Sequence, residues 1–182
     1  MISEKESIKI SKLLSLVLRH QPETIGITLD ENGWTETSAL IEKINQSGTM
    51  IDFETLKYIV DTNAKKRFAF NESTDKIRAN QGHSIDVDLE HKPQKPPATL
   101  YHGTGEKSVK SILESGIEKR SRQHVHLSAD IETAVKVGQR HGKVFVFEVL
   151  AEKMHTDNYI FYLSDNGVWL TDFVPADYLK KQ

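Results

Sequence analysis

The sequence predicts an α+β fold built from two lobes. The first half shows apolar residues at helical spacing and then two short alternating segments. The second half alternates short apolar runs with short helical patterns. Between them, residues 85–97 contain three prolines and mixed charge, which is typical of a connector. We therefore expect an N-terminal lobe at 1–84, a linker at 85–97 and a C-terminal lobe at 98–182.

The N-terminal lobe is expected to open with an amphipathic helix. Apolar side chains recur at helical spacing from Ile10 to Leu18, and Pro22 prevents the helix from continuing. A short apolar strand at 27–29 and a polar turn at 30–33 should follow.

Two more helices are expected in this lobe. One should lie around 38–44, with Ala39, Leu40 and Ile44 as its buried stripe. The other should start after Asp52, a favourable N-cap, because the apolar residues that follow share one helical face.

A hairpin should complete the lobe, since the segments 66–70 and 76–80 flank a polar turn. The resulting order of helix, strand, helix, helix and hairpin is that of a winged-helix module. Such modules commonly bind DNA, and helix-turn-helix readers do so through a helix in the major groove.

The charges of the third helix disfavour that use. It carries Asp52, Glu54 and Asp61 against Lys57 alone, a poor surface to present to phosphates. The basic residues gather elsewhere, on the hairpin and at the end of the first helix: Lys65, Lys66, Arg67, Arg78, Arg19 and His20. We therefore expect a local anion site in this lobe rather than a DNA-reading helix.

The C-terminal lobe should combine short strands with two helices in a mixed sheet. The expected strands are 99–102, 124–128, 143–150, 159–163 and 167–171, and the expected helices are 106–115 and 129–142. Gly116 should close the first of these helices, and Ser128 or Asp130 should cap the second.

One stretch of this lobe, RQHVHLSAD at 122–130, alternates polar and apolar residues. On a strand, Arg122, His124 and His126 would share one face, while the intervening Val125 and Leu127 enter the core. Such a face could hold a metal, line an anion site or be solvated. Metal is the least favoured, because the chain has no cysteine and no paired-histidine helix motif.

Composition limits the possible chemistry. The chain of 182 residues has no cysteine, which excludes disulfides, thiolate zinc sites and a cysteine nucleophile. Its net charge of −2 disfavours indiscriminate coating of nucleic acid, so any phosphate site must be local. The chain lacks an apolar run of about 18 residues and a secretory signal pattern, so we expect a cytoplasmic protein without a membrane span.

Six ordered motifs, taken together, resemble the RNA 2′-phosphotransferase family, also called tRNA 2′-phosphotransferases. They are LRHQP (18–22), KKRF (65–68), RANQGHS (78–84), YHGT (101–104), RQHVHLS (122–128) and NGVWLT (166–171). The resemblance covers nearly the whole chain. It implies a winged-helix lobe that binds RNA and phosphate, joined to an ADP-ribosyltransferase-like mixed β lobe that binds NAD⁺.

The resemblance also implies a reaction. An internal RNA 2′-phosphate is transferred to NAD⁺ through a 2′-phospho-ADP-ribosylated RNA intermediate, giving 2′-hydroxyl RNA, nicotinamide and ADP-ribose 1″,2″-cyclic phosphate. NAD⁺ is consumed as a co-substrate, and no metal is expected. The RNA could be tRNA-like or another RNA, with tRNA splicing the route associated with such phosphates. We expect a monomer without membrane partners.

The family pattern assigns residues to three roles. The catalytic set is Arg19, His20, Arg67 and Arg122. The NAD⁺-binding set is His102, Gly103, Thr104 and Ser128. The RNA-side set is Arg78, Gly82, His83 and Ser84. Arginine suits the first role because its planar fork matches phosphate oxygens, while histidine can donate to the phosphate or carry a proton near neutral pH.

Two other functions fit the same residues. One is an ADP-ribosyltransferase that modifies terminal phosphates of nucleic acids and stops after the first step. The other is a non-catalytic winged-helix protein that binds nucleic acid and senses NAD⁺. A stable ADP-ribosylated end would indicate the terminal-phosphate transferase, whereas a free cyclic phosphate would not. Release of nicotinamide would exclude the non-catalytic binding protein.

Overall fold

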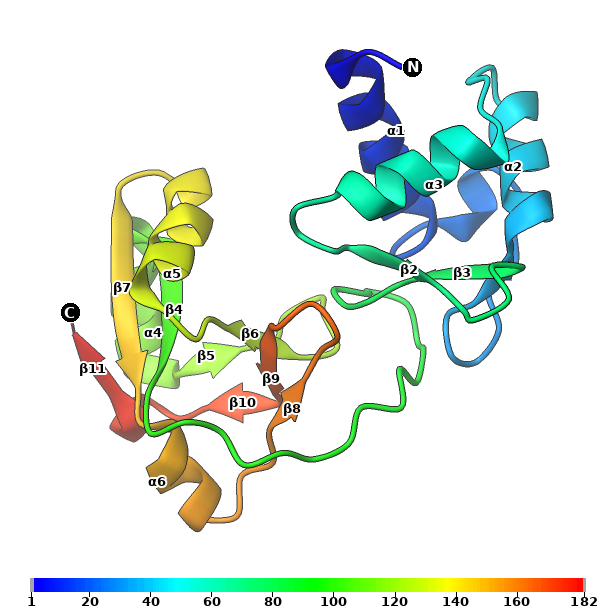
Figure 1. Cartoon of the computed structure of the whole chain (residues 1–182). Coiled ribbons are helices and arrows are strands. Elements are labelled where there is room, and N and C mark those ends of the chain that lie inside the picture. The colour runs from blue at the N-terminus through cyan, green and yellow to red at the C-terminus, as the bar shows by residue number, and fades with distance from the viewer. Residues whose placement is uncertain (1, 182) are drawn as a thin grey trace. The chain divides into compact units, whose positions relative to one another are not determined.

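The computed structural model describes residues 2–181 and divides the chain into two compact units, Met1–Glu90 and His91–Gln182 (Figure 1). The boundary falls inside the segment predicted to be a linker. That segment is ordered on each side: Val87 and Leu89 are buried, and the main-chain NH of Gln94 donates to the carbonyl of Phe161. Each end of the connector is therefore anchored to its own unit.

The N-terminal unit begins with α1 (Glu4–Val17), which starts earlier than its apolar pattern indicates. The cause is a capping box: the Ser3 hydroxyl accepts from the Glu6 main-chain NH, and the Glu6 carboxylate accepts from the Ser3 main chain. Two orphan donors at the helix start are thereby satisfied, so polar residues can form the first turns. The inner face of α1 carries Ile10, Leu14 and Val17 into the core.

A three-stranded antiparallel sheet completes the unit in the order β1-β3-β2. The predicted hairpin is confirmed as β2 and β3, and the predicted N-cap as well, because the Asp52 carboxylate accepts from the Thr55 NH at 2.8 Å. The elements after α1 are η1 (Pro22–Thr24), β1 (Thr35–Glu36), α2 (Thr37–Gln46), α3 (Phe53–Thr62), β2 (Phe68–Phe70) and β3 (Lys76–Ala79).

The strand predicted at 27–29 is wrong, because the strand lies after the turn. Thr35 and Glu36 pair with Ile77 and Lys76 of β3, whereas 27–29 has no strand partner. Ile27 is buried even so, which explains the apolar character of that segment. Burial without pairing gives the same sequence pattern as a short strand.

The predicted buried stripe of α2 needs one correction. Ala39 is exposed, and the buried face consists of Thr37, Leu40 and Ile44. Because α2 begins at Thr37, these three positions follow the i, i+3, i+7 spacing of one helical face, and position 39 lies off it.

The C-terminal unit contains small antiparallel sheets rather than the single mixed sheet predicted. Every strand pairing in residues 2–181 is antiparallel, and the sheets of this unit are β11-β7-β4, β6-β9-β8 and β10-β5. Its elements are β4 (Leu100–Gly105), η2 (Glu106–Ser108), α4 (Val109–Ser115), β5 (Ile117–Glu118), β6 (Val125–Leu127), α5 (Ile131–Gly138), η3 (Gln139–His141), β7 (Val144–Val149), α6 (Ala151–Thr156), β8 (Tyr162–Leu163), β9 (Trp169–Thr171), β10 (Phe173–Val174), η4 (Ala176–Tyr178) and β11 (Leu179–Lys181).

Two of these sheets are joined by a single bridge. Tyr101 of β4 and Ser128, just after β6, exchange both main-chain hydrogen bonds, at 2.9 and 2.8 Å. The core of the unit forms around fully buried Phe147 and Phe161. Of the two predicted caps for α5, the structure selects Asp130, which accepts from the Thr133 NH at 2.7 Å.

Helix α5 packs directly on β4 and β7 (Figure 1). The contact requires glycine, because a Cβ on Gly103 would lie 1.7 Å from the carbonyl oxygen of Ala134 in α5. A Cβ on Gly138 would lie 2.9 Å from the Thr104 main-chain nitrogen, so the glycine requirement is reciprocal. Glycine on both elements lets helix and strand backbones approach more closely than side chains would allow.

In residues 2–181, no helix is both long and apolar enough to cross a bilayer.

This packing predicts a large difference between two glycine-to-alanine substitutions. Gly103→Ala should destabilise the protein by about 3 kcal/mol, because the helix must move away from the strand. Gly167→Ala should cost only about 1 kcal/mol, the strain of its left-handed backbone, since nothing lies within 4 Å of the new Cβ. Denaturant unfolding of the two variants provides the comparison, and equal losses would contradict the packing argument.

Candidate functional site

The first cluster lies in the N-terminal unit and is organised by the backbone of Arg67. The Arg67 carbonyl accepts from a guanidinium nitrogen of Arg19 at 3.4 Å and from the main-chain NH of Asn80 at 2.9 Å. The Arg19 guanidinium also lies 5.8 Å from the ring centroid of Phe68, within cation–π range. The Arg19 guanidinium is thus held against the main chain of Arg67, the arginine predicted to act with it.

Asn80 fixes the loop that precedes β2. Its side-chain amide donates to the carbonyl of Lys66 at 2.7 Å, and Lys66 has a positive φ of 41°. A non-glycine residue in that conformation needs support from its surroundings. The sequence does not single out Asn80, because a buried asparagine inside a strand-like run has no distinctive pattern.

The same cluster includes His20 and Ser84. A ring nitrogen of His20, Nδ1, lies 2.9 Å from the Ser84 hydroxyl, and the Ser84 main-chain NH donates to the carbonyl of Arg19 at 2.9 Å. Ser84, predicted as an RNA-side residue, therefore contacts a predicted catalytic residue. Gly82 and His83 complete the turn: Gly82 has a φ of 87°, and His83 is only 1% exposed.

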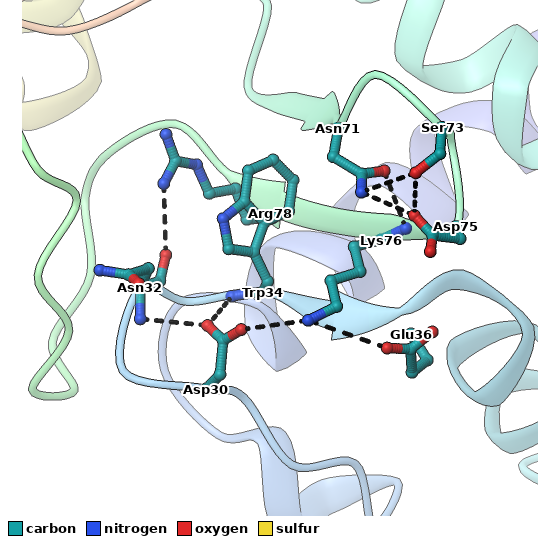
Figure 2. Close-up of polar contacts among 9 residues, drawn as sticks. All are labelled: Asp30, Asn32, Trp34, Glu36, Asn71, Ser73, Asp75, Lys76 and Arg78. Carbon is teal, nitrogen blue, oxygen red and sulfur yellow. Dashed lines mark hydrogen bonds and ion pairs between the residues drawn. The ribbon is translucent and has the colours of Figure 1, made fainter.

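Arg78 stacks on an aromatic ring. Its guanidinium lies 4.5 Å from the ring centroid of Trp34, and one of its nitrogens donates to the carbonyl of Asn32 at 3.5 Å (Figure 2). A Cβ on Gly33, the next residue, would lie 3.5 Å from a ring nitrogen of His83. Arg78 and His83 thus border the same turn.

The turn beneath Arg78 is internally braced. The Asp30 carboxylate accepts from the main-chain NH groups of Asn32 and Trp34, at 3.0 and 2.9 Å, and forms an ion pair with Lys76 at 3.6 Å (Figure 2). Such exposed ion pairs contribute at most about 1 kcal/mol, so the main-chain hydrogen bonds provide most of the order. Trp34, which no sequence motif marks as a site residue, owes its position to this turn.

A second cluster lies in the C-terminal unit and is centred on His126. A guanidinium nitrogen of Arg122 donates to Nδ1 of His126 at 3.0 Å. The main-chain carbonyl of His126 lies 3.3 Å from Nδ1 of His102. His126 therefore joins a predicted catalytic arginine to a predicted NAD⁺-binding histidine.

Burial sets the protonation of His102. Its pKa is lowered from the ordinary value, first because burial disfavours the charged ring and further because His141, Arg120 and Arg122 are positive neighbours. The hydrogen bond to the His126 carbonyl acts in the opposite direction. Since a carbonyl only accepts, a neutral His102 carries its proton on Nδ1, which leaves Nε2 as an acceptor.

The edge of β4 presents free main-chain groups at Gly103. Tyr101 points its NH and carbonyl away from β7, toward Ser128, and by the alternation of an antiparallel ladder so does Gly103. No other segment of the described chain bonds to those groups of Gly103. The Ser128 hydroxyl likewise makes no hydrogen bond within residues 2–181, whereas Thr104 is buried beneath α5.

The alternating stretch behaves largely as predicted. Val125 and Leu127 are buried at 3% and 1% exposure, but the strand spans only Val125–Leu127, so Arg122 reaches His126 from the preceding turn. His124 packs edge-on against Tyr162, with ring centroids 5.5 Å apart, and burial lowers its pKa. Within the described residues, no three His, Asp or Glu side chains gather as a metal site would need.

The fold and these clusters define a two-unit α+β protein with arginine- and histidine-rich sites suited to phosphate chemistry. Comparison with known proteins gives the class a name. Residues 5–173 match the model of the family described as RNA 2'-phosphotransferase, Tpt1 / KptA family.

Individual relatives match over almost their full lengths. A probable RNA 2'-phosphotransferase of Fusobacterium nucleatum subsp. nucleatum is 59% identical over 174 residues, 95% of this chain and 97% of that protein. The corresponding proteins of Flavobacterium johnsoniae and Nostoc punctiforme are 53% and 52% identical, over 98% and 99% of both chains. The chain belongs to the RNA 2'-phosphotransferase family, which confirms the resemblance carried by the six motifs.

The lowered pKa of His102 predicts a pH effect on stability. A histidine whose folded pKa is depressed takes up its proton more readily when unfolded, so stability should fall as the pH drops below the ordinary value of 6.5. His102→Asn should lose less stability than the native chain between pH 7.5 and 5, because asparagine does not titrate. The measurement is the melting temperature across this range, with pH 8 as the reference that isolates the cost of the substitution itself. An unchanged pH slope would contradict a buried, neutral His102.

Proposed function

We propose that the chain is a transferase that removes an internal 2′-phosphate from RNA by transferring it to NAD⁺. The products are 2′-hydroxyl RNA, nicotinamide and ADP-ribose 1″,2″-cyclic phosphate. The observation that carries the proposal is membership of the RNA 2'-phosphotransferase family over residues 5–173. NAD⁺ is a consumed substrate in this proposal, and no redox step occurs.

The architecture supports assigning one role to each unit. The order α1-β1-α2-α3-β2-β3, with the sheet order β1-β3-β2, fits a winged-helix lobe. The small antiparallel sheets of the C-terminal unit, with α5 packed on β4, fit an ADP-ribosyltransferase-like lobe. In the proposal, the first lobe holds RNA and supplies Arg19, His20 and Arg67 to the phosphate. The second lobe holds NAD⁺ and supplies Arg122.

In the first step, an oxygen of the 2′-phosphate forms a bond to C1″ of the nicotinamide ribose, and the bond from C1″ to nicotinamide breaks. A phosphate monoester with a second pKa of about 6 is already largely anionic at neutral pH, so this step needs positioning more than a base. The bond from the Arg19 guanidinium to the Arg67 carbonyl supports a phosphate clamp that uses both residues. Arg122, oriented by His126, is the third phosphate clamp of the proposal.

In the second step, the ribose 2″-oxygen forms a bond to the same phosphorus, and the bond from phosphorus to the RNA 2′-oxygen breaks. One proton leaves the 2″-hydroxyl, and one is gained by the departing RNA oxygen. His20 is the proposed carrier, because an imidazole titrates near neutral pH and Ser84 orients its ring from Nδ1. The arginines stabilise the charge that develops on the crowded phosphorus.

The C-terminal unit fits NAD⁺ at several groups. The outward NH and carbonyl of Gly103 match a carboxamide, which offers one acceptor and two donors. Nε2 of His102 suits a ribose hydroxyl as acceptor, and the uncommitted hydroxyl of Ser128 suits a second sugar contact. Thr104, buried beneath α5, supports the strand that presents these groups.

The direct test mixes the protein with NAD⁺ and a short RNA carrying one internal 2′-phosphate, without added metal. Mass analysis of RNA and nucleotide should show loss of the phosphate and appearance of cyclic-phosphorylated ADP-ribose. Stable ADP-ribosylated RNA ends with a terminal-phosphate substrate would favour the terminal-phosphate transferase instead. Intact NAD⁺ with every RNA would favour a non-catalytic binding protein.

Single substitutions in the phosphate cluster should separate the steps. Arg67→Ala and His20→Ala should each slow turnover by roughly 10² to 10³, the usual cost of losing one transition-state donor, and should accumulate the ADP-ribosylated RNA. Arg140→Ala is the matched control, since Arg140 is exposed and has no role in the proposal. Native rates in both cluster variants would overturn the phosphate-site assignment.

The NAD⁺ assignment has a separate test. Ser128→Ala should raise the KM for NAD⁺ with little effect on the KM for RNA, because its hydroxyl is expected to contact only the nucleotide. Steady-state kinetics with each substrate varied in turn provide the measurement. An unchanged dependence on NAD⁺ would remove Ser128 from that role.

A further inference from the structure

We propose that a groove in the N-terminal unit binds the RNA strand next to the 2′-phosphorylated nucleotide. The groove has a volume of about 500 Å³ and lies between α1, the end of α3 and the loop that leads into β2. Figure 1 shows these elements gathered in one unit. The identity of the substrate rests on the proposed function, whereas the shape and charge of the groove do not.

Charge is the first argument. Among the described residues, the charged ones that line the groove are Lys12, Lys65 and Arg67. Three positively charged side chains in one lining form a surface suited to a polyanion. A second groove of the same unit, of about 350 Å³, provides a contrast: Lys9 is its one charged residue, and its other walls include Ile10 and Ile25. Only the first groove has the charge expected for a nucleic-acid backbone.

Position is the second argument. Arg67 lines the groove and also belongs to the cluster proposed to hold the 2′-phosphate. Ser15, in the groove wall, precedes Arg19 by one helical turn, so this end of the groove leads to that cluster. From Ser15 back to Ser7 the wall extends for about 12 Å along α1, longer than one nucleotide step of about 3.4 Å in a duplex strand.

Hydrogen-bonding capacity is the third argument. The Ser11 hydroxyl accepts from the Asn63 side chain at 3.3 Å, which leaves its own proton for a ligand. The Ser7 hydroxyl makes no hydrogen bond within residues 2–181. RNA offers both phosphate acceptors and 2′-hydroxyl groups to such side chains. Ile8, 51% exposed at the rim, adds an apolar surface for a sugar or base.

A matched pair of substitutions tests the charge argument. Lys12→Ala should weaken binding of a labelled single-stranded RNA with one internal 2′-phosphate about five-fold, the effect of losing one favourable exposed charge contact. It should also reduce the salt slope of binding by about 0.7, the value for one phosphate contact on a single strand. Lys9→Ala removes the same charge from the same helix but from the other groove, so it should change neither quantity.

The absence of cysteine allows a second, independent measurement. Ser7→Cys introduces a single thiol in the groove, and Ser47→Cys introduces one in the other groove. RNA should slow alkylation of the thiol introduced at position 7 and leave the one at position 47 unaffected. This readout needs neither NAD⁺ nor turnover.

The outcomes separate this proposal from the proposed function. Selective effects at Lys12 and Ser7 would support RNA binding in the groove even if no RNA is dephosphorylated. In that case only the proposed reaction would be contradicted. Equal effects in both grooves would indicate nonspecific attraction and overturn the proposal, as would no effect in either. Normal turnover with unprotected thiols would leave the reaction intact and place the RNA strand elsewhere.

Discussion

The carbonyl oxygen of Arg67 is the point on which the N-terminal site depends. It accepts hydrogen bonds from the end of α1, through Arg19, and from the end of β3, through Asn80. Segments distant in sequence therefore converge on one acceptor, and the Arg19 side chain is positioned by a main-chain group as well as by its contact with Phe68. A main-chain carbonyl remains when the side chain at position 67 is replaced. The hydrogen bonds from Arg19 and Asn80 therefore do not depend on the Arg67 guanidinium.

The C-terminal site uses the same principle with a different residue. The main-chain carbonyl of His126 fixes the tautomer of His102, while the His126 ring accepts from Arg122. One residue thus orients both Arg122, proposed to bind phosphate, and His102, proposed to bind NAD⁺. Hydrogen bonds that orient site side chains before a substrate binds reduce the reorganisation required during a reaction.

Much of this organisation could be predicted from local pattern, and the rest depends on contacts that pattern does not contain. Long periodic helices such as α1 and the hairpin of β2 and β3 follow from spacing and turn residues. The two-residue strands β1, β5 and β10 could not be predicted in this way, because they exist only through distant partners. Among site residues, the arginines and histidines belong to recognisable motifs, whereas Asn80 and Trp34 act through bonds that only the folded chain reveals.

Gly103 combines two requirements in one residue. It must lack a side chain so that α5 can lie on β4, and its outward main-chain groups are those proposed to hold the carboxamide. No side-chain substitution can separate these duties, because any Cβ disturbs the packing first. Only a change in the backbone itself, such as an ester in place of the amide, would remove the donor while preserving the shape of the strand.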